Sequence, residues 1–459
     1  MFLSVVEGVL DVLKAVRLKS NPALTVGPPV RTGPSSRVGI ATVFQRVIDP
    51  KASIRVVAFD GSSAGPADAP VVIEIRTPTA LSYLMTSPQE LGLVRAYVTG
   101  NLCVHGDLYV ALSALSVGGE HLYLRDKVEL ARGLGLRHIR PVQPPPEEVT
   151  RRPYLLGLEA GLQGLLRHTK LRDSKAISHH YDVSNAFYSR FLGPSMSYTC
   201  ACYPKPDASL EEAQWAKHDL VARKLGLTAG MRLLDVGCGW GGMVMHAAKE
   251  YGVKALGVTL SRQQAEWAQR AIVERGLSDL AEVRHLDYRD VREDGFDAVS
   301  SIGLTEHIGA KELAGYFAFL AGRLRPQGRL LNHCITRPNT TFPARTGKFI
   351  DRYVFPDGEL EAAGEVVSAM QDNGFEVRHS ENLREHYAMT LRDWCDNLTK
   401  NWDESVAEVG ANRARVWLLY MAACRLGFDQ RVIELHQVLG VRCDSTGAAG
   451  LPLRPDWGP

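Results

Sequence analysis

Cysteine is scarce in this sequence, and no two cysteines stand in a CxxC pair. Eight of them are scattered over 459 residues. Because zinc motifs use closely spaced cysteine pairs, we expect no metal site from them. A chain of this length can also build a large core without disulfides, and we expect a reducing, cytoplasmic environment.

The chain also lacks a marked excess of charge and any long apolar run. Its 53 Lys and Arg against 51 Asp and Glu leave a net charge of +2, so no nucleic-acid partner is expected. No run approaches the roughly 20 apolar residues that a membrane-spanning helix needs. The 45% hydrophobic and 23% charged content is typical of a soluble globular protein, and the length predicts two domains.

The N-terminal segment has apolar residues at helical spacing but is not a typical secretory signal. Lys14, Arg17 and Lys19 follow the apolar part, and no small-residue cleavage site comes after them. Two interpretations remain open. The segment is either a helix docked on the protein or a helix that lies on a membrane surface.

A proline-dense segment at 141–148 (PVQPPPEE) is the best candidate for a domain boundary. We expect an N-terminal domain over 1–140, a Pro-rich linker over 141–155 and a second domain over 156–459. Residues 21–40 also have linker composition. Two β-rich runs with a turn-rich middle at 54–77, followed by a mixed helical segment, predict a smaller α+β N-terminal domain.

Strand-like and helical segments alternate in the second domain. The helix over 262–276 has Ser261 as a plausible N-cap, and the helix over 310–328 should end at Pro326 and Gly328. The alternation predicts an α/β fold with a mostly parallel sheet covered on both faces, with ligands bound beyond the carboxyl ends of its strands. The predicted strands are 231–236, 254–260, 281–287, 296–303 and 329–336.

The segment LLDVGCGWGG (233–242) stands where the first of these strands turns into a helix. Gly237, Gly239 and Gly241 allow a tight turn and close approach to a ligand. The spacing is GxGxG, whereas a dinucleotide site has GxGxxG and an acidic residue about 20 positions later. We favour an S-adenosylmethionine site, while a phosphate site for NAD and a glycine turn without function remain alternatives.

The blocks around this turn resemble the cyclopropane fatty acid synthase family and its mycolic-acid-modifying relatives. They are DVGCGWGG, GVTLSRQQ, LDYRD and SIGLTEHIG, with HHYDVSNAFYSRFLGPSMSYTCACY before them and FIDRYVFPDG and LREHYAMTLRDW after them. The resemblance covers residues 170–435, and the N-terminal part is similar to the smaller N-terminal domain of longer bacterial members. It implies a Rossmann-like class I methyltransferase fold that binds S-adenosylmethionine.

The resemblance also implies which residues form the site. The cofactor contacts would be Tyr198, Thr199, Asp235, Gly237, Gly239, Thr259, Leu260, Gln264, Asp287 and Tyr288. The catalytic residues would be Cys200, Glu306, His333 and Tyr387, which hold a bicarbonate ion that acts as the base, with help from the backbone of Ile335. His180 and Tyr181 would line the acceptor pocket. For each catalytic candidate an ordinary structural role, such as a core histidine or a packed tyrosine, remains open.

The implied reaction is methyl transfer to the cis double bond of an unsaturated fatty acyl chain, which leaves a carbocation that must lose a proton. Loss from the added methyl gives a cyclopropane, and a hydride shift before the loss gives a methylene or methyl branch. Thr305 stands where the family has an aromatic residue, and Cys202 is a second departure, so the product stays open. We expect a phospholipid acceptor, a peripheral membrane surface and a homodimer. The alternatives are a small-molecule methyltransferase of the same fold and an inactive lipid-binding protein.

Overall fold

The computed structural model describes residues 39–87, 90–118, 141–149, 184–355 and 358–458. The chain divides into two compact units. The first takes the described residues up to 149 together with Gly347–Tyr353 and Gly410–Leu426, and the second takes the rest. The predicted N-terminal helix and the last part of the predicted linker lie outside the described residues, and the predicted domain boundaries stay a prediction.

The first unit is built on a four-stranded sheet of order β2-β1-β3-β4. Strands β1 and β3 are the two predicted β-rich runs; they pair in parallel, and every second residue of each is buried. The elements of this unit are α2 (Ile40–Gln45), β1 (Ile54–Ala58), β2 (Ser63–Ala64), β3 (Val71–Ile75), α3 (Pro78–Thr86), α4 (Leu91–Val98), β4 (Leu102–His105), α5 (Leu108–Gly118), α14 (Lys348–Tyr353) and, up to Leu426, α18 (Ala411–Asp429).

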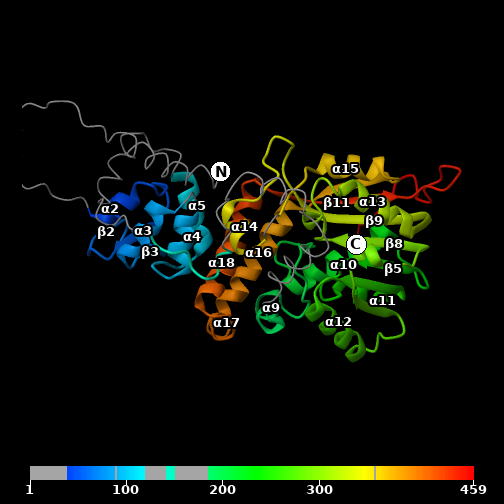
Figure 1. Ribbon diagram of the computed structural model, residues 1–459, viewed down its shortest axis with the longest axis horizontal. Helices are drawn as coiled ribbons and strands as arrows, with labels where there is room; N and C mark the ends of the chain where they lie inside the picture. The colour runs from blue at the N-terminus through cyan, green and yellow to red at the C-terminus, as the bar shows by residue number, and fades with distance from the viewer. Residues whose placement is uncertain (1–38, 88–89, 119–140, 150–183, 356–357, 459) are drawn as a thin grey trace, which may run out of the picture. The chain divides into compact units, whose positions relative to one another are not determined.

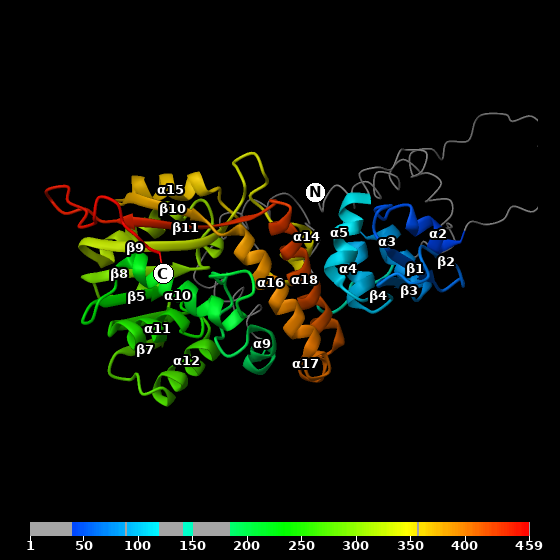
Figure 2. The ribbon, with the colours of Figure 1, turned by 180° about the vertical axis from the view of Figure 1, so that it is seen from behind.

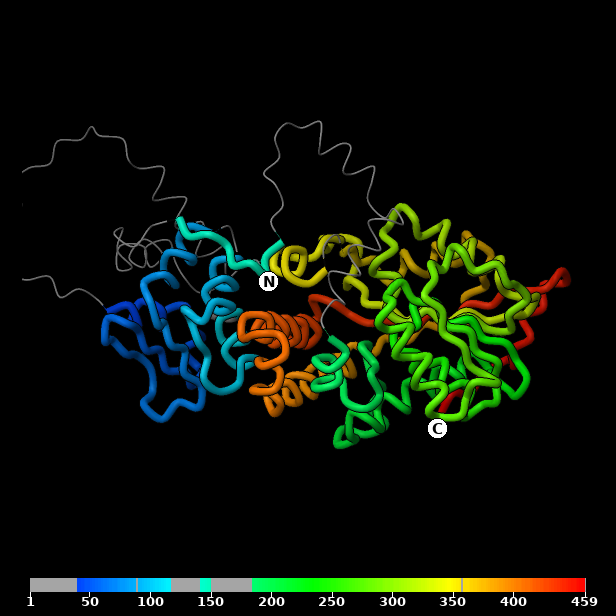
Figure 3. The backbone as a smooth tube through the Cα atoms, turned by 60° about the horizontal axis from the view of Figure 1, so that its bottom comes forward, coloured from blue at the N-terminus to red at the C-terminus, as the bar shows by residue number. Residues whose placement is uncertain are grey.

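The second unit is built on a seven-stranded sheet of order β10-β11-β9-β8-β5-β6-β7 (Figures 1 and 2). Its strands are β5 (Arg232–Val236), β6 (Lys254–Thr259), β7 (Ala281–His285), β8 (Phe296–Ile302), β9 (Leu324–Thr336), β10 (Glu376–Asn382) and β11 (Glu434–Val441). Its helices are α9 (Asn185–Leu192), α10 (Leu210–Leu225), α11 (Gly242–Tyr251), α12 (Arg262–Glu274), η3 (Tyr288–Asp290), η4 (Thr305–His307), α13 (Leu313–Arg323), α15 (Ala363–Asp372), α16 (Arg384–Lys400) and α17 (Trp402–Val409). The path of the chain through each unit can be followed by colour in Figure 3.

Helices cover both faces of the larger sheet, as the alternating pattern predicted. Figure 1 shows α11 and α12 on one face and α13 and α15 on the other. The neighbouring residues Leu233 and Leu234 of β5 point to opposite faces and join two separate buried clusters. Strands β9, β8, β5, β6 and β7 are parallel, and β10 and β11 add an antiparallel edge. The prediction of an α/β fold with a mostly parallel sheet is therefore confirmed.

The predicted end of one helix was wrong. Helix α13 ends at Arg323, and β9 begins at Leu324, before Pro326. The reason is pairing with β8: Leu324 lies opposite Phe296, and the register then shifts before Ala298 meets Arg329. Pro326, which has no N–H to donate, falls inside this irregular stretch, where a ladder bond is not needed.

Strand β11 brings the C-terminal part of the chain beside β9. It lies between β9 and β10, and all eight of its residues are buried (Figure 2). Its register places Leu435 opposite Ile335 and Gln437 opposite His333. Residues that are about 100 positions apart in sequence thus become direct neighbours at the carboxyl end of β9.

Candidate functional site

A glycine turn at the carboxyl end of β5 forms one wall of the candidate site. The N–H of Gly237 donates to the carbonyl oxygen of Val258 on β6 at 2.9 Å. Gly237 and Gly239 have φ angles of +71° and +55°, a left-handed conformation that favours glycine. A Cβ atom on Gly239 would have no neighbour within 4 Å, so the backbone there borders open space. The turn can therefore bring its peptide groups close to a ligand.

A cavity lies against this turn, within the second unit. It holds about 530 Å³ of space, with the solvent at its mouth included. Several lining residues are ones that the sequence predicted as cofactor contacts: Tyr198, Thr199, Asp235, Gly237, Gly239 and Gln264. The structure therefore gathers these residues, which come from three separate segments, around one space.

Two further predicted contacts lie at the carboxyl end of β6. The hydroxyl of Thr259 donates to Gln264 Oε1 at 2.9 Å, which ties Thr259 to the cavity wall. Ser261 caps α12 and accepts from the backbone N–H of Gln264, as predicted. The carbonyl oxygen of Leu260 lies 3.1 Å from His285 Nε2. These bonds hold the start of α12 beside the glycine turn.

The last two predicted contacts, Asp287 and Tyr288, follow β7. Asp287 caps the short helix η3, and its carboxylate forms an ion pair with Arg289 at 2.7 Å. The ring of Tyr288 packs edge-on against Tyr316 at 5.2 Å between centroids. Asp287 thus already accepts from a guanidinium, which the sequence did not indicate, and its contact with adenine stays a prediction.

A buried lysine on α10, which the sequence did not single out, also lines the cavity. Lys217 Nζ donates to Thr199 Oγ1 at 3.0 Å and lies 2.9 Å from His218 Nε2. Burial lowers the pKa of Lys217 to about 8 and raises that of Asp235 to about 7, although Ser300 donates to this carboxylate at 2.6 Å. The charges of Lys217 and Asp235 partly balance each other. In the sequence Lys217 looks like any solvent-facing helix residue, so only the packing identifies it.

Two of the predicted catalytic residues lie near the carboxyl ends of β8 and β9. Glu306 lies on η4, just beyond β8, and its Oε1 accepts from the backbone N–H of Ile335 at 2.7 Å. His333 precedes Ile335 by two positions on β9, and its carbonyl oxygen accepts from the N–H of Gly303 at 2.8 Å. Gly303 also lines the cavity, so this cluster adjoins the space beside the glycine turn.

Backbone contacts connect the other two predicted catalytic residues to the same place. The carbonyl oxygen of Leu383 accepts from the N–H of Tyr387 at 3.2 Å and lies 3.8 Å from the thiol of Cys200. The N–H of Leu383 donates to Leu435 at 2.8 Å, and Leu435 lies opposite Ile335 in the sheet. Backbone bonds thus link the segments of Cys200 and Tyr387 to β11, the neighbour of β9, and the convergence of the four side chains on one site stays a prediction.

Glu306 has an unusual carboxylate. Although part of the residue is exposed, its Oε2 atom is buried and has no hydrogen-bond partner among the described residues. Burial raises the pKa of Glu306 to about 7, although the hydrogen bond from the N–H of Ile335 acts in the opposite direction. Near neutral pH this carboxyl can therefore be a hydrogen-bond donor or an acceptor.

His333 and Cys200 are both buried and uncharged. Burial lowers the pKa of His333 well below its usual value, and the nearby Lys217 and Lys224 act in the same direction. Burial likewise raises the pKa of the Cys200 thiol, so it is a poor nucleophile. All eight cysteines of the chain are free. Tyr387 is buried too, and its ring stacks on Phe428 at 4.5 Å between centroids.

Both residues that depart from the family pattern lie within the described structure. The hydroxyl of Thr305 donates to Asn332 on β9 at 2.7 Å, so this residue ties η4 to the sheet. The backbone N–H of Cys202 donates to the carbonyl of Ala213 on α10 at 3.0 Å. The predicted acceptor-pocket residues His180 and Tyr181 lie outside the described residues. Over the described ranges, no group of three or more His, Cys, Asp or Glu is arranged to hold a metal ion.

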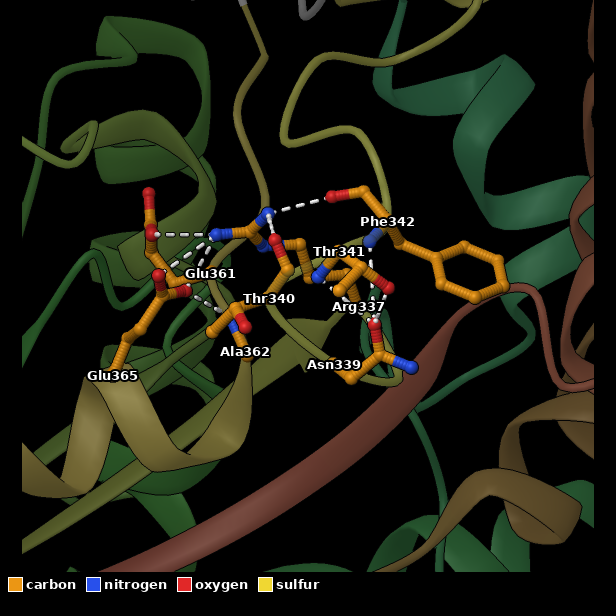
Figure 4. Close-up of polar contacts among 8 residues, drawn as sticks. All are labelled: Arg337, Asn339, Thr340, Thr341, Phe342, Glu361, Ala362 and Glu365. Atoms are coloured by element: carbon orange, nitrogen blue, oxygen red, sulfur yellow. Dashed lines mark hydrogen bonds and ion pairs between the residues drawn. The ribbon is translucent and has the colours of Figure 1, made fainter.

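A clamp built on Arg337 holds the loop that leaves β9 next to Ile335 (Figure 4). Its guanidinium donates to both carboxylate oxygens of Glu365 at 2.8 and 2.7 Å, and to the carbonyl oxygens of Thr340 and Phe342 at 3.1 and 2.6 Å. Glu361 lies 4.0 Å from the same guanidinium, and burial together with Glu365 raises the pKa of Glu361 to about 7. The clamp thus fixes the chain just beyond the residue that binds Glu306.

Comparison with known proteins agrees with this arrangement. The family model described as mycolic acid cyclopropane synthetase matches residues 168–438. A probable fatty acid methyltransferase of Mycobacterium tuberculosis is 53% identical over 412 residues, which are 88% of this chain and 95% of that protein. A probable fatty acid methyltransferase of Pseudomonas putida is 37% identical over 87% of this chain and 94% of its own length.

Solved structures give the same result. A cyclopropane synthase of M. tuberculosis aligns with a TM-score of 0.56 and 33% identity over 60% of this chain and 98% of that one. A mycolic acid cyclopropane synthase complexed with SAH and CTAB aligns with the same score and identity over 58% of this chain and 98% of that one. The glycine turn, the sheet order and these matches agree: the chain belongs to the mycolic acid cyclopropane synthetase family of S-adenosylmethionine-dependent class I methyltransferases.

Proposed function

We propose that the protein methylates the cis double bond of an unsaturated fatty acyl chain of a phospholipid, and that the product is a cyclopropane or a methylene- or methyl-branched fatty acid. The observation that carries the proposal is the position of buried, unpaired polar atoms beside the glycine-turn cavity. Glu306 and His333 each have a buried atom without a partner in the part of the chain that the structure describes. The names of the fatty acid methyltransferases and cyclopropane synthases that resemble this chain support the same acceptor class.

The cavity residues fit S-adenosylmethionine. When bound, this cofactor supplies an electrophilic methyl group on a sulfonium. Gly237 and Gly239 would let the backbone approach its methionine part, because no side chain intervenes. Thr259 and Gln264, which are already hydrogen-bonded to each other, would border the ribose. Tyr198 and Thr199 would cover it, and the buried Lys217 adds a positive charge that suits a carboxylate.

The catalytic cluster fits a small oxyanion such as bicarbonate. When bound, bicarbonate supplies a base for the proton that the methylated acyl chain must lose. Glu306 Oε2 and His333 Nε2 are the buried atoms that could hold it, and a carboxyl with a pKa of about 7 can donate to an anion. Cys200 and Tyr387 would complete the wall. These residues exclude water from the acyl carbon, which protects a carbocation from hydration.

The first unit contains no residues to which we assign chemistry, and we propose that it serves dimerisation or membrane docking. None of the described helices is long and apolar enough to cross a bilayer. In this proposal a substrate in a membrane is reached from the membrane surface. Sedimentation of the full chain with vesicles, with and without anionic lipid, tests docking. Analytical ultracentrifugation tests the dimer.

One experiment tests the function directly. The protein is incubated with methyl-labelled S-adenosylmethionine and vesicles of a monounsaturated phospholipid, and the released fatty acids are identified by mass spectrometry. A labelled cyclopropane, methylene or methyl-branched chain supports the proposal and names the product. Vesicles of the saturated lipid are the control. Label on a small amine or phenol, retained in Glu306→Gln, would instead favour the small-molecule methyltransferase.

A further inference from the structure

A buried row of polar side chains runs from α10 into the catalytic cluster. Lys224 Nζ donates to Gln437 Oε1 at 2.7 Å, and Gln437 Nε2 lies 3.2 Å from His333 Nδ1. The three residues are at most 1% exposed. Lys224 also forms an ion pair with Glu381, which is the partly exposed end of the row. We call Lys224, Gln437 and His333 the relay.

Strand register builds this row. Glu381 on β10 lies opposite Gln437 on β11, and Gln437 lies opposite His333 on β9. Residues directly opposite each other point to the same face of a sheet, so the three side chains stand side by side across three strands. Helix α10 covers that face and supplies Lys224.

The donors and acceptors in the relay leave one arrangement of protons. An ammonium group has only donors, so the Gln437 group that faces Lys224 must be the carbonyl oxygen. The other group, the amide nitrogen, has only hydrogens to offer to His333 Nδ1. Nδ1 must therefore accept, and the neutral ring carries its proton on Nε2. A proton on Nδ1 would face the amide hydrogens, which disfavours both the other tautomer and the imidazolium.

The Nε2 atom of His333 is buried and has no hydrogen-bond partner within the described ranges. We propose that Gln437 and Lys224 are positioning residues that hold His333 as a hydrogen-bond donor through Nε2, aimed at an anion in the catalytic cluster. This inference rests on the proposed function. It also means that His333 does not itself take up the proton from the acyl chain, because neither nitrogen can accept one while the relay is intact.

The test changes the relay without changing its shape. In Gln437→Glu, one carboxylate oxygen still accepts from Lys224, but the other now faces Nδ1 as an acceptor. We expect the His333 proton to move to Nδ1, or the ring to become charged. Lys224→Met is the second variant: the amide is then free to turn, and both tautomers should appear. His436→Gln is the matched control, because His436 is the neighbour of Gln437 on β11 and bonds to Thr336 at 2.8 Å on the other face.

The tautomer is read from nitrogen-15 histidine NMR spectra of the full chain, with the His333 signals identified by their loss in His333→Asn. Calorimetry with S-adenosylhomocysteine checks that each variant is folded and that its affinity is unchanged. In Gln437→Glu, kcat should fall by about a hundredfold, the size of one acid–base or hydrogen-bonding contribution. Gln437→Met, which removes the donor to His333 and the acceptor for Lys224 but places no acceptor against Nδ1, should lose less.

The NMR and product measurements separate failure of the relay from failure of the proposed function. A native signal for Nδ1–H or for imidazolium would overturn the inference, and so would a neutral ring that keeps its proton on Nε2 in Gln437→Glu. If the tautomer shifts as expected but the native protein methylates no unsaturated lipid, the relay stands and the proposed function fails. If the lipid is methylated and the tautomer does not respond, the function stands and the relay is wrong.

Discussion

Replacing Glu306 by Gln should make the protein more stable at high pH while it removes activity. The buried carboxyl has a pKa of about 7 in the folded chain and 4.5 as its ordinary value. Between these values the folded state binds a proton that the unfolded state has released, so this group's contribution to stability falls as pH rises from about 4.5 to about 7. The Gln side chain cannot ionise, and its amide oxygen can still accept from the N–H of Ile335.

The size of the effect follows from the two pKa values. Ionising the buried carboxyl reduces the free energy of unfolding by about 3 kcal/mol at pH 8 and by about 1 kcal/mol at pH 5. Burying an uncharged amide has its own unfavourable free energy, but that term is the same at both pH values. The stability gain of Glu306→Gln should therefore be about 2 kcal/mol larger at pH 8 than at pH 5.

The assay is thermal unfolding of native and Glu306→Gln protein at both pH values. A difference of about 2 kcal/mol corresponds to about 5 °C in Tm for a unit of this size. The exposed Glu312 provides the control, because Glu312→Gln should change Tm little at either pH. Equal Tm shifts of Glu306→Gln at pH 5 and pH 8, or no shift at pH 8, would refute the reasoning. Product formation by the same variant should fall by about a hundredfold or more.

Three further results are expected. Gly239→Ala should weaken binding of S-adenosylhomocysteine at least about tenfold in calorimetry, because the added Cβ enters the space beside the glycine turn and alanine must adopt a left-handed conformation. Gly276 has the same kind of φ and no neighbour within 4 Å of an added Cβ, so Gly276→Ala should leave this affinity unchanged. Arg337→Met should lower the free energy of unfolding by about 3 kcal/mol in a denaturant titration, since it leaves the carboxylates of Glu361 and Glu365 without their cation. Arg345 is exposed, so Arg345→Met should change the free energy of unfolding little. An equal loss in both variants would contradict a stabilising role of the Arg337 clamp. Because burial raises the pKa of the Cys200 thiol, iodoacetamide at pH 8 should leave Cys200 unmodified until the chain is unfolded, although partly exposed cysteines react. Peptide mass spectrometry that finds Cys200 itself rapidly alkylated in the native protein would argue against a buried thiol.

Local residue order was enough to place the strands and helices around the glycine turn. Glycines that need a positive φ, a serine that caps α12 and alternating apolar runs are signals carried by neighbours in the chain. The end of α13 was missed, because pairing of Leu324 with Phe296 outweighs the helical pattern of the residues before Pro326. The inclusion of Gly347–Tyr353 and Gly410–Leu426 in the first unit had no signal in composition either.

The residue types of the site could be anticipated from the resemblance, but their chemical states depend on the fold. The sequence shows a glutamate, a histidine and a lysine far apart, and nothing in their spacing says that they meet. Pairing of β9 with β11 puts Gln437 against His333, and α10 then buries Lys224 over both. Burial and hydrogen-bond direction decide which atoms carry protons, and both depend on contacts between residues more than 100 positions apart, which local sequence cannot specify.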